Sequence, residues 1–254
     1  MKIGHVERGD GWELRYGRWE DVLEDVELVD ALISDPPYGT RTHEGHDRGV
    51  RGSKASSSPL DASERRELSY SAWRPSDVEA FAEAWHPRAA GWFAVMSCDE
   101  LARHWRGCLE LRGRCGFAPL PCMIPGMTVR LQGDGPSSWS VWLNVARPRG
   151  EPFSKWGTLR GEYRATPDRG HIGGKPLAMM RAIVRDYTRR TNEDGASSLI
   201  VDPCAGGGTT LLAAVLEGRR AIGAEADPDT FAKAVKRLRA GYTPSFDFGG
   251  EEEG

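Results

Sequence analysis

The chain has 254 residues, of which 39% are apolar and 28% charged, and its net charge is −3. This balance is that of a globular protein with a sizeable core, and it excludes both a disordered chain and a uniformly basic surface. The apolar runs are too short to span a membrane and no signal peptide opens the chain, so we expect a cytoplasmic protein without a membrane partner. Five scattered cysteines without a Cys-x-x-Cys pair predict reduced thiols and no metal site.

The first part of the chain predicts alternating strands and helices. Residues 12–23 indicate a short strand followed by a helix, and residues 29–34 indicate a strand. Residues 40–72 contain few apolar side chains, which predicts a mobile loop within the domain. The elements expected next are a helix from Ser76, a strand over 92–96, a helix over 99–111 and a strand over 141–146. Because helices alternate with strands, the predicted fold class is α/β.

The second part of the chain continues this alternation. The polar segment 147–170 carries six Arg or Lys against three acidic residues. A helix is expected to open at Lys175-Pro176, because proline suits the first turn of a helix. The elements expected after it are a strand over 197–201, a helix over 211–217, a strand over 221–224 and a helix from about Pro228. Residues 244–254 predict a loose tail.

The first polar motif is Asp35-Pro36-Pro37-Tyr38, at the end of an apolar strand. The exocyclic amino group of a nucleobase is a weak nucleophile, because its lone pair is delocalised into the ring. Hydrogen bonds to the Asp35 carboxylate and the Pro36 carbonyl would free that lone pair, and the two prolines fix the backbone. Tyr38 offers a flat face for an extruded base. The motif therefore indicates methylation of an amino group on a base, although alone it is equally compatible with an ordinary turn.

The second motif is a glycine loop, Asp202-Pro203-Cys204-Ala205-Gly206-Gly207-Gly208-Thr209-Thr210, placed between a strand and a helix. The next strand ends at Glu225, an acid that can bind ribose hydroxyls. The loop is neither the dinucleotide fingerprint nor a phosphate loop. An acid at its entrance suits a ligand with a cationic amino group and no phosphate, such as S-adenosylmethionine (SAM). The alternative is a tight turn that binds nothing.

Together the two motifs resemble the amino-group DNA methyltransferases, and within them the permuted group whose catalytic motif precedes the SAM-binding motif. The resemblance implies one catalytic domain over 1–254, with a doubly wound, Rossmann-like sheet of seven strands and a small target-recognition insert. It implies SAM as cofactor, S-adenosylhomocysteine as product, no metal, DNA as partner, a bacterial or phage origin, and allows a homodimer.

The resemblance assigns catalysis to Asp35, Pro36, Pro37 and Tyr38. The residues that it assigns to the cofactor are Asp202, Pro203, Cys204, Ala205, Gly206, Gly208, Thr209, Glu225, Ala226, Lys175 and Trp19. In the family's pattern, Lys175 flanks the methionine end of SAM and Glu225 holds its ribose. The chain departs from that pattern in two places: Gly17-Arg18-Trp19 replaces Gly-Asp-Cys, and Ile172-Gly173-Gly174 replaces Pro-Thr-Gln.

The motif begins with Asp, which resembles the adenine-N6 enzymes more than the cytosine-N4 enzymes, and the target base must be flipped or single-stranded. The expected DNA contacts are Arg41, His43, Lys155, Trp156, Arg160 and Arg164, each of which could equally be a solvated surface residue. The remaining alternatives are an enzyme of this fold acting on RNA or a protein amide, and a degenerate module that binds DNA or SAM. A chain of this length leaves no room for a nuclease, so we expect a lone methylase.

Overall fold

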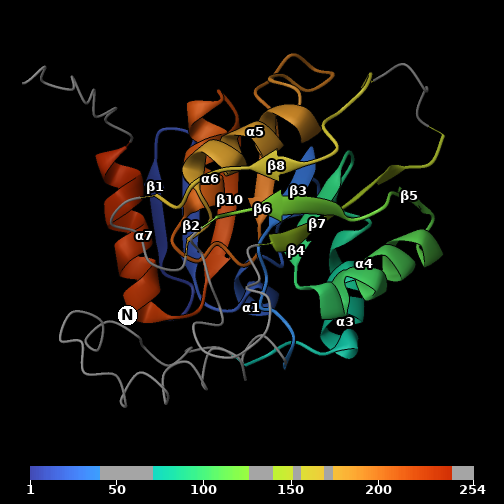
Figure 1. Ribbon diagram of the computed structural model, residues 1–254. Coiled ribbons are helices and arrows are strands. Elements are labelled where there is room, and N and C mark those ends of the chain that lie inside the picture. Colours follow the sequence, from blue (N-terminus) through green and yellow to red (C-terminus); the bar gives the residue numbers. More distant parts are fainter. Residues whose placement is uncertain (41–70, 126–139, 151–155, 169–173, 242–254) are drawn as a thin grey trace, which may run out of the picture.

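A computed structural model describes residues 1–40, 71–125, 140–150, 156–168 and 174–241 (Figure 1). Within these ranges, ten strands form one mixed sheet in the order β1-β2-β10-β9-β3-β4-β7-β6-β8, and β5 pairs with β7. Two separate clusters of buried side chains pack on the sheet. The prediction of a doubly wound α/β fold is confirmed.

The strands are short, as expected for a sheet covered by helices. They are β1 Val6–Gly9, β2 Trp12–Tyr16, β3 Ala31–Ser34, β4 Phe93–Ser97, β5 Arg114–Gly116, β6 Leu120–Met123, β7 Ser140–Pro148, β8 Tyr163–Arg164, β9 Leu199–Asp202 and β10 Arg220–Glu225. Five neighbouring strands are parallel, in the order β2, β10, β9, β3 and β4. Strand β7 runs antiparallel to β4. The carboxyl ends of five strands therefore meet at one edge of the sheet, the carboxyl edge.

Helices cover both faces of the sheet (Figure 1). They are α1 Trp19–Val22, α3 Pro75–Trp85, α4 Asp99–Leu111, α5 Leu177–Tyr187, α6 Thr209–Leu216 and α7 Pro228–Ala240. One buried cluster draws its helical side chains from α5, α6 and α7, and the other draws them from α1, α3 and α4. Helices α3, α4 and α7 each bury one apolar stripe, in agreement with the helical spacing of their apolar residues, whereas α6 is buried at every position from Thr209 to Ala214.

The described sheet is larger than the expected seven strands. Seven strands run from β2 to β6, and β1, β5 and β8 are added to them. These added strands have two to four residues each, too few for a period of two to be recognised in the sequence. They form because a longer neighbour offers free backbone groups, as β7 does to β5.

Some predictions need correction or fall outside the described residues. Helix α6 begins at Thr209 and not at Leu211, because Gly208 adopts a left-handed conformation (φ +74°) directly before it. The predicted loop 40–72 and the predicted tail 244–254 lie almost wholly outside the described residues. No helix in the described ranges is both long enough and apolar enough to cross a membrane. The five cysteines are free thiols, three of them buried.

Candidate active site

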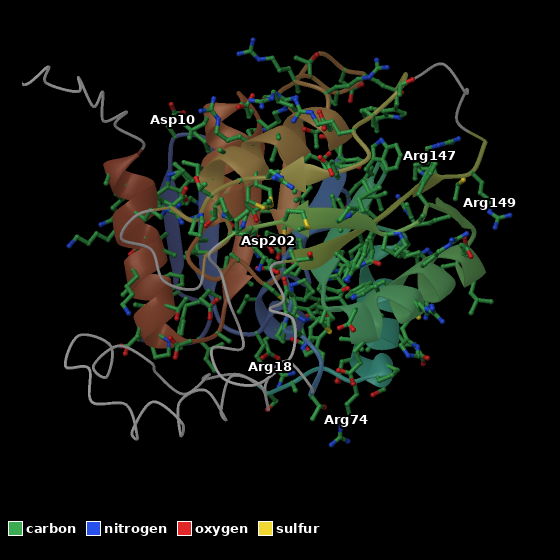
Figure 2. The ribbon with its side chains drawn as sticks, viewed as in Figure 1. Asp10, Arg18, Arg74, Arg147, Arg149 and Asp202 are labelled. Atoms are coloured by element: carbon green, nitrogen blue, oxygen red, sulfur yellow. The ribbon has the colours of Figure 1, made fainter. Side chains whose placement is uncertain are left out.

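The strand order brings the two sequence motifs together. Strand β9 lies between β3 and β10, and all three run in the same direction. Glu225, Asp202 and Asp35 therefore leave the sheet side by side at its carboxyl edge, where doubly wound folds place their ligands. Because neighbouring strands lie about 4.8 Å apart, the outer two strands of this set are about 10 Å apart. Asp202 lies near the centre of the molecule (Figure 2).

The Asp35 carboxylate is held on both oxygens. Tyr38 Oη donates to Asp35 Oδ1 at 2.8 Å. Lys175 Nζ donates to Asp35 Oδ2 at 2.5 Å, although the two residues are 140 positions apart in the sequence. The same Nζ lies 5.0 Å from the centre of the Tyr38 ring. Three residues predicted for two different roles thus form one cluster, and the Asp35 side chain remains 26% exposed.

The backbone that follows the catalytic motif is anchored to the rest of the domain. Trp73 N–H donates to the Tyr38 carbonyl at 2.9 Å, and Gly39 N–H donates to Cys98 Sγ at 3.3 Å. The Trp73 ring packs against Phe81, with 5.4 Å between ring centres. These contacts tie the motif to the end of β4 and to α3, so its conformation is determined by tertiary contacts as well as by the prolines.

The glycine loop leaves backbone open to a ligand. Gly206 and Gly208 both have left-handed backbone angles (φ +51° and +74°), which other residues rarely adopt. Gly208 N–H donates to the Ala205 carbonyl at 2.8 Å, and Ala205 N–H donates to the Ala224 carbonyl at 2.9 Å. A Cβ added to Gly206 would meet no atom within 4 Å. The loop is therefore tightly folded and still has free space beside Gly206, as a ligand-binding loop requires.

Asp202 is buried beneath this loop and connects it to β3. Its Oδ1 accepts hydrogen bonds from Ser34 Oγ at 2.7 Å and from Cys204 N–H at 3.1 Å. Burial raises the pKa of Asp202 to about 6, while hydrogen bonds from Thr210, Ser34 and Cys204 act in the opposite direction. Asp202 thus orders the start of the loop and links it to β3.

The raised pKa of Asp202 predicts a pH dependence of folding stability. A carboxyl with a higher pKa in the folded state binds more protons there, so its contribution is present below pH 4 and is lost as pH rises through 6. The difference in unfolding free energy between the wild type and Asp202→Asn should fall by about 2 kcal/mol from pH 4 to pH 7. Urea unfolding at several pH values measures this difference, and a constant difference would contradict the prediction.

Glu225 lies at the end of β10 and is held by its own turn. Its Oε1 accepts from Asp227 N–H at 2.7 Å, and its backbone carbonyl accepts from Gly17 N–H at 2.9 Å. Burial raises the pKa of Glu225, although backbone donors including Asp227 oppose this. Ala226, next in the chain, is exposed. Glu225 is therefore positioned where an acid could bind ribose hydroxyls over the β10–β2 side of the site.

Trp19 is placed differently from the other residues predicted for the cofactor. Its ring packs edge-on against Phe81, with 5.4 Å between ring centres, and lies 6.2 Å from the ring of Trp85. Both partners belong to α3 on one face of the sheet. This packing accounts for the half-buried state of Trp19 without a ligand.

Arg237 and Asp168 connect the glycine loop to its surroundings and were not predicted from the sequence. Arg237 Nη1 donates to Thr209 Oγ1 at 2.6 Å and to the Gly207 carbonyl at 3.4 Å. Its Nη2 lies 3.8 Å from Asp168, whose carboxylate accepts from Leu177 N–H at 2.9 Å. Arg237 therefore links α7 to the loop and to the start of α5. An arginine on an amphipathic helix carries no sequence signal that separates this role from a solvated charge.

Two residues predicted to contact DNA lie at the amino edge of the sheet. Trp156 packs edge-on against Trp92, which precedes β4, with 5.8 Å between ring centres. Arg160 lies 3.7 Å from Asp186, near the end of α5. Because α5 starts at the carboxyl edge beside Lys175, its last residues lie at the opposite edge.

Arg164 is exposed on β8. From β8 the chain runs toward the carboxyl edge, where Asp168 contacts the start of α5. The other three residues predicted to contact DNA, Arg41, His43 and Lys155, lie outside the described residues.

The chain resembles known DNA methylases in part of its sequence and in its fold. Residues 125–236 match the family model described as DNA methylase. The crystal structure of the M1.HpyAVI–SAM complex aligns with a TM-score of 0.62 and 17% identity, covering 89% of this chain and 99% of that chain. The cytosine-N4-specific PvuII DNA methyltransferase has the same TM-score at 14% identity, covering 92% and 89% of the two chains. A proposed DNA modification methylase of Thermus thermophilus, complexed with SAM, gives 0.58 at 18% identity over 89% and 93%.

No curated protein sequence matches the chain. The structural matches define the class: the chain has the Rossmann-like fold of the methyltransferases. The match to the DNA methylase model covers less than half of the chain, in a segment that includes Lys175, the glycine loop and Glu225. Together these findings show the fold over most of the chain and a likeness to DNA methylases over residues 125–236.

Proposed function

We propose that this protein transfers a methyl group from SAM to N6 of adenine in DNA, with the target base flipped out of the helix. The observation that carries the proposal is the position of Asp35 and Tyr38 at the end of β3, next to β9 and its open glycine loop. A carboxylate acceptor, a carbonyl and an aromatic face thus lie beside a ligand-binding loop. That combination serves transfer to an amino group on a planar ring.

The residues at the carboxyl edge fit SAM. The acidic start of the loop at Asp202 and the free space at Gly206 suit the methionine part, and Glu225 suits the ribose. SAM, when bound, supplies the methyl group: the S–CH₃ bond breaks as the N–CH₃ bond forms, and the bonding electron pair returns to the positively charged sulfur. The β10-to-β3 spacing of about 10 Å gives room for a ligand that extends from Glu225 toward Asp35.

The protein's own contribution is positioning and hydrogen bonding. Asp35 and the Pro36 carbonyl accept hydrogen bonds from the two N–H bonds of the target amino group, which directs the nitrogen lone pair away from the ring. The Tyr38 ring provides the face on which the base stacks. The partial exposure of the Asp35 side chain gives the proton released from nitrogen a route to water. Such positioning is worth several kcal/mol of the reaction barrier.

The choice of base follows from the first residue of the motif. Asp35, where a serine would resemble the cytosine enzymes, favours adenine. Transfer to N4 of cytosine is the second candidate, because the cytosine-N4-specific PvuII enzyme aligns as well as any of the reported structures. The two amino groups are chemically similar, so the same cluster could serve either.

We further propose that the chain belongs to the permuted group, since Asp35 precedes the glycine loop by more than half of the chain. For DNA contact we favour Arg164, because it is exposed on the strand that leads to the carboxyl edge. Trp156 and Arg160 then serve to hold the 156–168 segment in place. Phosphate contacts of this kind position a duplex without reading its sequence.

Tritiated SAM incubated with mixed-sequence DNA, followed by nucleoside analysis, tests the proposed function. We expect label in N6-methyladenine with the wild type and none with Asp35→Ala. Label in N4-methylcytosine would show that the target is N4 of cytosine and not N6 of adenine. Parallel incubations with RNA and with protein separate the other substrates of this fold. SAM binding without transfer to any of them would identify a binding module and reject the enzyme assignment.

A further inference from the structure

Lys175 is bound to the catalytic carboxylate in the structure. Its Nζ lies 2.5 Å from Asp35 Oδ2 and 5.0 Å from the centre of the Tyr38 ring. The resemblance to known methyltransferases had placed this lysine at the methionine end of the cofactor. The contacts instead place it with the residues that would hold the target base.

The environment of Lys175 requires a partner for its charge. The side chain is only 7% exposed. A buried ammonium is costly unless it is paired and hydrogen-bonded, and Asp35 provides that pairing. The backbone of the lysine is restricted from one side, because Pro176 follows it and Asp168 binds the next N–H, that of Leu177. The lysine therefore reaches Asp35 from a backbone that is anchored at the start of α5.

Lys175 and Tyr38 each donate a hydrogen bond to a different oxygen of the Asp35 carboxylate. Tyr38 Oη occupies Oδ1 and Lys175 occupies Oδ2, so the plane of the carboxylate is set by two groups on different elements. Each carboxylate oxygen can accept two hydrogen bonds, which leaves acceptor sites for the N–H of a target base. The contact of Nζ with the Tyr38 ring means that a single lysine restrains both the acceptor and the stacking face.

We propose that Lys175 is a positioning residue for methyl transfer, which orients Asp35 and Tyr38 toward the target base and does not bind SAM. This inference rests on the proposed function, since it assigns Lys175 a part in that reaction. Its physical basis is that a carboxylate fixed in orientation before the base arrives loses less entropy in the transition state. The effect of losing Lys175 should therefore fall on turnover and not on cofactor affinity.

The kinetic test compares variants at saturating SAM. Lys175→Met should lower kcat by about a hundredfold, as expected when a reacting group is misplaced, with the Kd for SAM unchanged. Lys175→Arg, which keeps the charge and the donors, should recover part of the rate. Glu225→Ala should show the opposite pattern, with weakened SAM binding. Lys233→Met removes an exposed lysine of α7 and controls for loss of charge. Weakened SAM binding with unchanged kcat in Lys175→Met would overturn the inference.

A double-mutant cycle in thermal unfolding tests the Lys175–Asp35 pair independently of activity. Asp35→Asn leaves the buried Lys175 charge without its counter-charge, and Lys175→Met leaves the partly exposed Asp35 carboxylate without its own, so each variant should lower Tm. The double variant should lose less than the sum of the two single losses. Additive losses would overturn the inference even if the enzyme is active. If the wild type methylates no substrate, the proposed function fails, and the cycle still decides whether Lys175 restrains Asp35.

Discussion

Replacing Asp35 by alanine is expected to abolish methyl transfer while leaving SAM affinity unchanged. The carboxylate is the charged acceptor that would bind the target amino group, and it belongs to β3, whereas the glycine loop and Glu225 belong to β9 and β10. Losing one preorganised electrostatic contact of this kind costs about 100- to 1,000-fold in rate. Because Asp35→Ala also leaves the Lys175 charge buried and unpaired, we expect a loss at the upper end of this range or beyond it.

Single-turnover transfer from labelled SAM and calorimetric titration with SAM measure the two halves of this prediction. Asp194→Ala removes an exposed acid from the turn before β9 and serves as the matched control, with both quantities expected at wild-type values. Thermal unfolding establishes that each variant is folded. Substantial turnover by folded Asp35→Ala would show that the methyl acceptor is activated elsewhere.

The second large effect is expected for Glu225→Ala, which should weaken SAM binding by about a hundredfold. Hydrogen bonds to a charged group are worth about 1.5–3 kcal/mol each, and Glu225 has two oxygens available for ribose hydroxyls. One of them also accepts from Asp227 N–H at 2.7 Å, so the turn after β10 loses an acceptor in the variant. The loss of affinity therefore combines a missing contact with a less ordered turn.

Raising the SAM concentration separates this effect from a loss of catalysis. At saturating SAM, Glu225→Ala should recover most of the wild-type kcat, because the Asp35 cluster on β3 is unchanged. Glu24→Ala, which removes an exposed acid after α1, is the control and should bind SAM normally. An unchanged Kd for SAM in Glu225→Ala would remove Glu225 from the cofactor site.

The elements that were predicted correctly are those whose signal is local. Val95 and its neighbours in β4, and Val201 and its neighbours in β9, form apolar runs of strand length, and both strands are buried. The apolar spacing of α3 and α7 likewise matches the buried side chains of both helices. The short strands β1, β5, β6 and β8 were missed. The pairing of β5, β6 and β8 depends on partners elsewhere in the chain, whereas β1 pairs with β2, which directly follows it.

The two local motifs, Asp35-Pro36-Pro37-Tyr38 and the glycine loop, could be recognised from neighbouring residues alone. Proline restriction, glycine conformation and the chemistry of an acid after a strand are properties of neighbouring residues, so a linear sequence contains them. The expectation that the two motifs face one site came from family resemblance, and the parallel order of β3, β9 and β10 provides the geometry.

Which distant residues contact these two motifs depends on the arrangement of the strands and helices. Lys175 reaches Asp35 across 140 positions, and Arg237 reaches Thr209 from α7. Trp156, in contrast, packs on Trp92 at the amino edge, away from the catalytic cluster. The physical reason is the same in each case. A charged or aromatic side chain has one chemistry but many potential partners, and the order of strands in the sheet determines which partner it meets.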